Sequence, residues 1–233
     1  MSKLFLVLIA ILPVFLICLF VYLKDDEKEP LSLLARLFIS GILSVSLVYL
    51  FTYSLQLLIP SFIVMPRSGY LRLFLYTFFS VALIEEFSKY IMAYVFGYKD
   101  RNFNQPYDIV IYTVFVSLGF ACFENIIYVL QNGFVNAILR AVTAVPIHAC
   151  YGVFMGYYLA LARLSKKHRA KRIFIKNMIL SILVPVCLHT LYDYLIFLND
   201  PFFILIVMIV IVIMYYFSIK KLVQLSKVEL NHI

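Results

Sequence analysis

The sequence predicts an all-α protein, a polytopic transmembrane helical bundle of about seven spans that forms one integral-membrane domain over residues 1–233. Of the 233 residues, 64% are hydrophobic and only 14% are charged, which is far from the composition of a soluble domain. Apolar segments of about 20 residues, the length that crosses a bilayer, recur along the chain. The charged residues gather in the short connections between these segments. Almost no sequence is left for a separate soluble domain.

The first apolar segment, residues 3–23, is expected to be retained as a membrane span. It has the length of a span and no small-residue cleavage motif follows it, so it differs from a secretory signal peptide. The six further predicted spans cover 33–59, 71–96, 109–130, 142–163, 173–198 and 201–219. The connections are polar at 24–30, 60–70, 97–108 and 164–172, moderately apolar at 131–141, and reduced to a turn at Asn199 and Asp200.

Small residues in two of the spans indicate close helix packing. Gly152 and Gly156 form a GxxxG motif in the fifth span, and Ser40, Gly41 and Ser44 form a similar run in the second. Small side chains let two helix backbones approach each other within a membrane. We expect both motifs to be structural.

Lys and Arg are distributed unevenly over the two ends of a seven-span bundle. One end receives fifteen of them and the other receives four. The fifteen are Lys24, Lys28, Arg36, Lys99, Arg101, Arg163, Lys166, Lys167, Arg169, Lys171, Arg172, Lys176, Lys220, Lys221 and Lys227, and the four are Lys3, Arg67, Arg72 and Arg140. Because cytoplasmic loops carry an excess of basic residues, this bias predicts a cytoplasmic C-terminus and an extracytoplasmic N-terminus. The net charge of +8 therefore indicates topology and contact with anionic lipid headgroups, and we expect no nucleic-acid partner.

Several ionisable side chains lie inside the apolar spans, and these are the candidate functional residues. A charge at the bilayer centre costs at least about 2.5–3.5 kcal/mol, so such residues usually face the bundle interior or a water-filled cavity. They come from four spans: Glu85, Glu86 and Lys89; Glu124; His148; and His189 with Asp193. At about 1.5 Å of rise per helical residue, they are expected in the outer half of the membrane, with the glutamate pair somewhat deeper. We expect one polar cluster that opens to the extracytoplasmic side.

The glutamate pair and Lys89 are expected to share one helix face. Lys89 follows Glu85 by four residues and Glu86 by three, and both spacings bring side chains together on a helix. If one carboxylate pairs with Lys89, the other is available for general acid–base catalysis. A structural ion pair that joins this span to its neighbour would produce the same pattern.

Two further pairs have the i,i+4 spacing, Glu124 with Tyr128 and His189 with Asp193. A carboxylate at this spacing can fix the tautomer and orientation of an imidazole. His148 lies two residues after a proline, and a proline in a span often marks a kink beside a cavity. Each feature could instead be a hydrogen bond between helices. Titratable groups that come together from several helices favour a functional site.

The sequence resembles the PrsW family of intramembrane proteases at four motifs. These motifs are Glu85-Glu86-Phe-Ser-Lys89, Phe123-Glu124-Asn-Ile-Ile-Tyr128, the isolated His148, and His189-Thr-Leu-Tyr-Asp193. The surroundings also agree, with Gln105-Pro106-Tyr107-Asp108 before the fourth span, Arg140 before the fifth, and Gly152 with Gly156 after the first histidine. Asp108 is followed by Ile where the family often has Gly. The resemblance covers residues 84–197, with the motifs in the family's order.

The resemblance implies an endopeptidase that makes the first, extracytoplasmic (site-1) cut in a single-pass membrane substrate such as an anti-sigma factor, during regulated intramembrane proteolysis. The family is also distantly similar to the type II CAAX prenyl proteases, which use a glutamate pair and histidines. On this hypothesis Glu85 or Glu86 is the general base. His148 and His189 orient water or stabilise the oxyanion. The supporting residues are Lys89, Glu124, Tyr128 and Asp193.

We expect catalysis without a cofactor. His148, His189 and either Glu124 or Glu85 could form a three-ligand zinc site with an open position for water. However, the candidate ligands lack the HExxH spacing that places two histidines on one helix face. Zinc would also leave the glutamate pair partly unused. Glutamate-dependent catalysis is therefore favoured over zinc-dependent catalysis.

Two functions of other classes fit the same pattern. A proton- or ion-coupled transporter also places Glu, His and Asp in midplane helices, although the two halves of this chain lack matching spans broken by Gly or Pro. A non-catalytic membrane scaffold would use the polar groups as clasps between helices. For a protease, the expected partners are a single-pass membrane protein substrate and membrane lipids, and the expected location is the cell membrane.

Overall fold

The computed structural model describes residues 2–25, 27–66 and 69–225. All regular structure in this part of the chain is helical, as predicted. The α-helices are α1 (Lys3–Lys24), α2 (Leu31–Leu58), α3 (Tyr70–Tyr76), α4 (Leu83–Ala93), α5 (Asp108–Val142), α6 (Ala144–Lys167), α7 (Lys171–Phe197) and α8 (Pro201–Leu225). The 3-10 turn η1 (Pro60–Phe62) and the π-helical segments η2 (Thr77–Ala82) and η3 (Tyr94–Tyr98) complete them. Arg67 and Lys227, which the charge count includes, lie outside the described residues.

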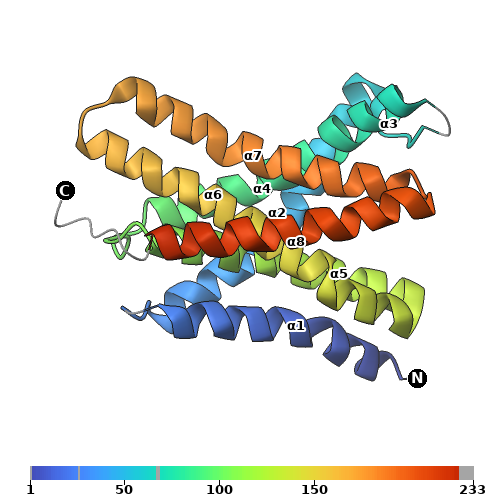
Figure 1. Cartoon of the computed structure of the whole chain (residues 1–233), viewed down its shortest axis with the longest axis horizontal. Coiled ribbons are helices and arrows are strands. Elements are labelled where there is room, and N and C mark those ends of the chain that lie inside the picture. Colours follow the sequence, from blue (N-terminus) through green and yellow to red (C-terminus); the bar gives the residue numbers. More distant parts are fainter. Residues whose placement is uncertain (1, 26, 67–68, 226–233) are drawn as a thin grey trace.

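Each predicted span corresponds to one helical rod in the described part of the chain. Five helical stretches are long and apolar enough to cross a membrane: Lys3–Lys24, Leu31–Leu58, Asp108–Lys167, Lys171–Phe197 and Pro201–Leu225. The stretch Asp108–Lys167 holds the two rods α5 and α6, and the third predicted span is the composite rod that runs from α3 through η2 and α4 to η3. Successive rods run in opposite directions, so the start of α1 and the end of α8 lie at opposite ends of the bundle (Figure 1). The described residues therefore form about seven crossings, as predicted.

α5 does not run straight through its 35 residues. Gly133 has a φ of 78° and a ψ of −163°, a conformation that favours glycine. The chain folds back there. A hydrogen bond from Arg140 to Glu124, which lies 16 residues earlier in the sequence, shows this. A straight helix would separate these two residues by about 24 Å. Residues 134–142, most of which were expected to be a simple connection, are therefore the second limb of a helical hairpin at the end of the bundle (Figure 1).

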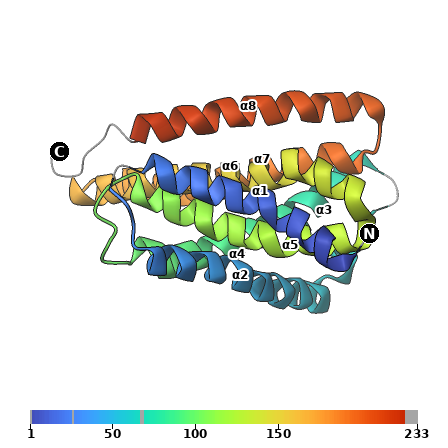
Figure 2. The ribbon, with the colours of Figure 1, turned by 90° about the horizontal axis from the view of Figure 1, so that it is seen from below.

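α5 and α6 pack against each other at the centre of the bundle. Figure 2 shows α8 on one face and α2 on the opposite face, with α1, α5, α6 and α7 between them. A Cβ atom on Gly152 would lie 2.8 Å from the Cα atom of Val114, and one on Gly156 would lie 2.5 Å from the Cα atom of Val110. Only glycine fits at these two positions, so the GxxxG motif is confirmed as the close contact between α6 and α5.

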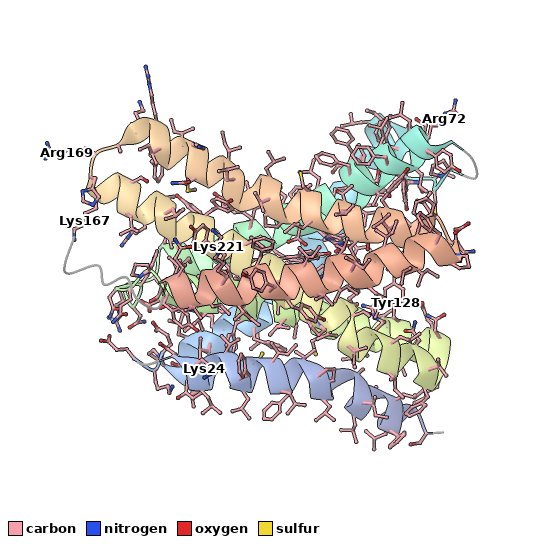
Figure 3. All side chains as sticks on the ribbon, viewed as in Figure 1. Lys24, Arg72, Tyr128, Lys167, Arg169 and Lys221 are labelled. Atoms are coloured by element: carbon pink, nitrogen blue, oxygen red, sulfur yellow. The ribbon has the colours of Figure 1, made fainter. Side chains whose placement is uncertain are left out.

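Basic side chains mark one end of the bundle. In Figure 3, Lys24, Lys167, Arg169 and Lys221 lie toward the end at which α1, α6 and α8 finish, whereas Arg72 and Tyr128 lie toward the other end. The first end also carries three buried carboxylates, which belong to Asp25, Glu29 and Asp108. Burial, together with the negative charge of Asp108, raises the pKa of Glu29 to about 7.

Glu29→Gln is expected to stabilise the protein at alkaline pH. In the unfolded chain a Glu titrates near pH 4.3, so between about pH 4.5 and pH 7 the folded protein holds a proton that the unfolded chain has released. The wild-type protein therefore loses stability as the pH rises through this window, whereas the variant lacks this loss. In detergent the variant should melt at a higher temperature than wild type, and the difference in melting temperature should be larger at pH 8 than at pH 5. The control is Glu27→Gln at an exposed position, and a margin that does not change with pH would contradict the account.

Candidate active site

The ionisable residues of four predicted spans meet in one cluster. They are Glu85, Glu86 and Lys89 on α4, Glu124 on α5, His148 on α6, and His189 with Asp193 on α7. The glutamate pair lies in the first turn of α4, directly after the π-helical segment η2. π-helical turns often occur at functional sites, because they shift the side chains of the following turn. The cluster joins all four helices through ion pairs and hydrogen bonds.

Lys89 lies at the centre of this cluster. Its side chain is fully buried, and its Nζ atom is 2.7 Å from Oε1 of Glu86 and 3.2 Å from Nδ1 of His148. The Nζ atom is also 3.8 Å from Oε2 of Glu85 and 4.0 Å from the centroid of the Phe120 ring. Partners on α4, α5 and α6 therefore hold a fixed positive charge in a site where an unpaired charge would be strongly unfavourable.

His189 lies between two carboxylates. Its Nδ1 atom is 2.9 Å from Oε1 of Glu86, and its Nε2 atom is 3.2 Å from Oδ2 of Asp193. Ionised carboxylates only accept hydrogen bonds, so both ring nitrogens donate and the ring is an imidazolium. The Tyr151 ring stacks on it, with 4.9 Å between the centroids and an interplanar angle of 17°. His189 is thus a second positive charge with a fixed orientation.

His148 has a different protonation state from His189. The ammonium group of Lys89 has no acceptor, so Nδ1 of His148 must accept its hydrogen bond. Nε2 of His148 then carries the proton and donates to Oε2 of Glu124 at 3.0 Å. His148 is therefore a neutral imidazole with a defined tautomer. The centroids of the two histidine rings are 5.8 Å apart.

Glu85 is less constrained than Glu86. Its side chain is 15% exposed, whereas the side chain of Glu86 is fully buried. Oε2 of Glu85 lies 3.8 Å from Nζ of Lys89 and 3.9 Å from Nε2 of His189, and it accepts no hydrogen bond from the described residues. Among the described residues, Glu85 therefore offers a buried oxygen without a hydrogen bond on a side chain that is partly exposed, and this combination suits a general base.

The cluster lies away from the basic end of the bundle. His148 is four residues from the start of α6, which corresponds to about 6 Å. His189 is eight residues from the end of α7, or about 12 Å. Glu86 is deeper, sixteen residues after the start of α3, or about 24 Å. Tyr128 is partly exposed at this end, and its ring centroid lies 4.2 Å from Cζ of Arg140.

Three residues contact the cluster directly, and a fourth joins it through one of these three; none of the four was among the predicted site residues. Phe120 precedes Glu124 by four positions, and Tyr151 follows His148 by three. Helical spacing alone could have placed these two on the same faces as the titratable residues. The other two are Asn125 and Arg140. Their contact depends on the fold-back of α5, which no spacing rule predicts.

The candidate zinc ligands do not converge on a common point. Among the described residues, no group of three His, Cys, Asp or Glu side chains is placed to hold a metal ion. Nδ1 of His148 faces the ammonium group of Lys89, and both ring nitrogens of His189 face carboxylates. Each imidazole thus lacks a lone pair directed at a metal position. As arranged, these residues do not fit a metal ion.

Comparison with known proteins supports the same family as the motifs. The family described as "PrsW family intramembrane metalloprotease" matches residues 29–219. The chain belongs to the PrsW family. This match is longer than the resemblance over 84–197 and takes in α2 and most of α8, whereas α1 lies outside it.

Curated relatives of this PrsW chain agree with the family match. The chain is 35% identical to Protease PrsW of Oceanobacillus iheyensis, over 80% of each protein. It is 38% identical to Protease PrsW of Geobacillus kaustophilus, over 77% of this chain and 74% of the relative. It is 34% identical to Protease PrsW of Bacillus subtilis, over 75% of each. No solved structure matches. The chain is therefore a multi-pass intramembrane protease.

Proposed function

We propose that this protease makes an extracytoplasmic, site-1 cut in a single-pass membrane protein such as an anti-sigma factor, with Glu85 as the general base. The observation that carries this proposal is the carboxylate of Glu85, which accepts no hydrogen bond from the described residues and faces the two fixed positive charges of Lys89 and His189. A base beside two cations is suited to a reaction in which water loses a proton while negative charge develops nearby.

The proposed reaction is hydrolysis of a peptide bond by water. Glu85 takes a proton from the water molecule as its oxygen attacks the peptide carbonyl carbon. The imidazolium of His189 stabilises the resulting oxyanion, with further stabilisation from the charge of Lys89. Glu85 then passes its proton to the amide nitrogen as the C–N bond breaks, which leaves a new carboxylic acid and a new amine.

The remaining residues of the cluster maintain the charges that this reaction uses. Glu86 accepts hydrogen bonds from both Lys89 and His189 through one carboxylate oxygen, so it holds the two cations together. Asp193 fixes the other ring nitrogen of His189. A carboxylate that fixes an imidazole in this way sets its orientation and protonation state.

We propose that this chemistry needs no metal ion, although the family description contains the word metalloprotease. The position of Lys89 supports this proposal, because its ammonium group lies between Glu86 and His148, where a cation that used both as ligands would have to lie. The positive charge that a metal would supply comes instead from the Lys89 and His189 side chains.

The outward direction of the cut rests on two observations. His148 lies near the start of α6 and His189 in the last third of α7, away from the basic end of the bundle, and basic ends of membrane proteins are cytoplasmic. The same geometry supports a membrane-embedded substrate, because a buried site among helices suits a chain that itself enters the membrane. Co-expression with a panel of tagged single-pass proteins tests this. A fragment should appear with the wild-type protease, be absent with Glu85→Gln, and map to the outer side of the substrate's span.

The topology of the protease itself is expected to match this direction. A reporter fused after the C-terminus should be active in the cytoplasm, and a reporter inserted between residues 60 and 66 should be active outside. Alkaline phosphatase and green fluorescent protein fusions measure the two sides independently. An extracytoplasmic C-terminus would reverse the orientation and would contradict the outward cut.

A further inference from the structure

We propose that Arg140 is a positioning residue of the active site, and that α1 holds it in place through Asn125. This inference goes beyond the family assignment, because α1 lies outside the residues that the family match covers. It assigns a role to the hairpin at Gly133, which the proposed reaction does not otherwise use.

Arg140 binds two residues of the first limb of α5. Its Nη2 atom donates to Oε2 of Glu124 at 2.9 Å, and its Nε atom donates to Oδ1 of Asn125 at 2.8 Å. The planar guanidinium group suits two such acceptors at once, which a lysine ammonium group cannot reproduce. The exposed Tyr128 ring lies against the guanidinium group. Arg140 is thus fixed by three neighbours, although it lies in a short segment beyond the turn.

Asn125 connects this arrangement to α1. Its side chain is fully buried, and its Nδ2 atom donates to the backbone oxygen of Ala10 at 2.8 Å. Ala10 also packs in a small apolar cluster with Val129 and Ala137, one from each limb of the hairpin. All three are fully buried. α1 therefore contacts both limbs and fixes the distance between them.

The consequence for the active site passes through Glu124. The same Oε2 atom of Glu124 accepts from Arg140 and from Nε2 of His148. By holding this oxygen, Arg140 keeps the proton of His148 on Nε2 and leaves Nδ1 to accept from Lys89. Without Arg140, Glu124 is free to turn toward solvent, and His148 loses one of the two contacts that fix its orientation and its tautomer. We expect the position of the Lys89 ammonium group to change when the His148 ring is no longer held.

Arg140→Gln is expected to lower kcat for substrate cleavage about 10- to 100-fold, the usual effect of removing a partner that orients a functional side chain. KM should change less than about twofold, because Arg140 is not expected to touch the substrate. Arg140→Lys should recover part of the activity, and Asn125→Leu should act in the same direction as Arg140→Gln. The matched control is Arg72→Gln, an exposed arginine at the same end of the bundle (Figure 3), which should retain wild-type kcat.

Two further measurements separate positioning from general damage to the fold. In a Glu124→Gln background, Arg140→Gln should cause no additional loss of activity, because both residues act through one contact. A full additional loss would overturn the proposal. Nitrogen-15 spectra of the histidine side chains in lipid should show the proton of His148 on Nε2 in the wild type and a mixture of tautomers in Arg140→Gln.

The spectroscopic measurement does not depend on cleavage, whereas the kinetic measurements rest on the proposed function. A wild-type protein that cleaves no substrate would count against the proposed function, and the His148 spectra would still decide the role of Arg140. Unchanged spectra in Arg140→Gln, Arg140→Lys and Asn125→Leu would overturn that role.

Discussion

Replacing Glu85 by glutamine is expected to lower kcat by about 10²- to 10⁴-fold, the contribution of a general base to a proton-transfer reaction. Glutamine has the same shape but cannot take a proton from water. Because Glu85 accepts no hydrogen bond from the described residues, its replacement should leave the fold and membrane insertion unchanged. Single-turnover cleavage of a purified substrate in proteoliposomes measures the effect.

The matched variant Glu86→Gln separates the roles of the two neighbouring glutamates. Glu86 accepts from Lys89 and His189 in a fully buried position, so its replacement should lower thermal stability as well as activity. Wild-type activity in Glu85→Gln would move the general base to another residue and would contradict the proposed reaction.

Lys89→Met is expected to cause the largest loss of stability of any single substitution in the cluster. It removes the buried ammonium group and leaves the carboxylate of Glu86 and Nδ1 of His148 without this donor. Breaking a buried ion pair on one side costs about 3–5 kcal/mol. Unfolding in mixed micelles, followed by circular dichroism against denaturant, measures this loss.

Two further variants serve as comparisons for the stability loss in Lys89→Met. Lys176→Met removes a lysine from an exposed position of α7 and should change stability by less than about 0.5 kcal/mol. In the double variant Lys89→Met with Glu86→Gln, the loss should be smaller than the sum of the single losses, because the orphaned carboxylate is also neutralised. A Lys89→Met protein as stable as wild type would show that the ammonium group is not held as described.

The spans could be predicted from the sequence because their signal is local. About 20 consecutive apolar residues must form a helix within a bilayer, since no other structure satisfies the backbone there. The ends were less predictable. The last span was expected to finish at residue 219, but α8 continues to Leu225. Lys220 and Lys221 follow the apolar stretch directly, and a helix can continue past the membrane into water while its charged residues are solvated.

The membership of the cluster was also predictable, whereas its connections were not. Glu85, Lys89 and His189 stand out because a charge is unfavourable inside an apolar span. The contact between Lys89 and His148 depends on the relative rotation and depth of α4 and α6, which the sequence of neither helix contains. The contact of Arg140 could not be predicted from local sequence patterns either. Its contact with Glu124 requires the positive φ of Gly133, and a glycine in an apolar segment does not reveal which conformation it adopts.

The most direct test of the account is the activity of the purified protease after removal of metal ions. Protein in detergent is treated with a membrane-permeant chelator, analysed for bound metals, reconstituted with a cleavable single-pass substrate, and assayed beside Glu85→Gln. We expect wild-type protein with well below one zinc ion per chain to cleave at its original rate, and Glu85→Gln to show no cleavage above background. Loss of wild-type activity on chelation, restored by one equivalent of zinc, would contradict the proposed metal-free reaction and would require Lys89 to leave its position between Glu86 and His148.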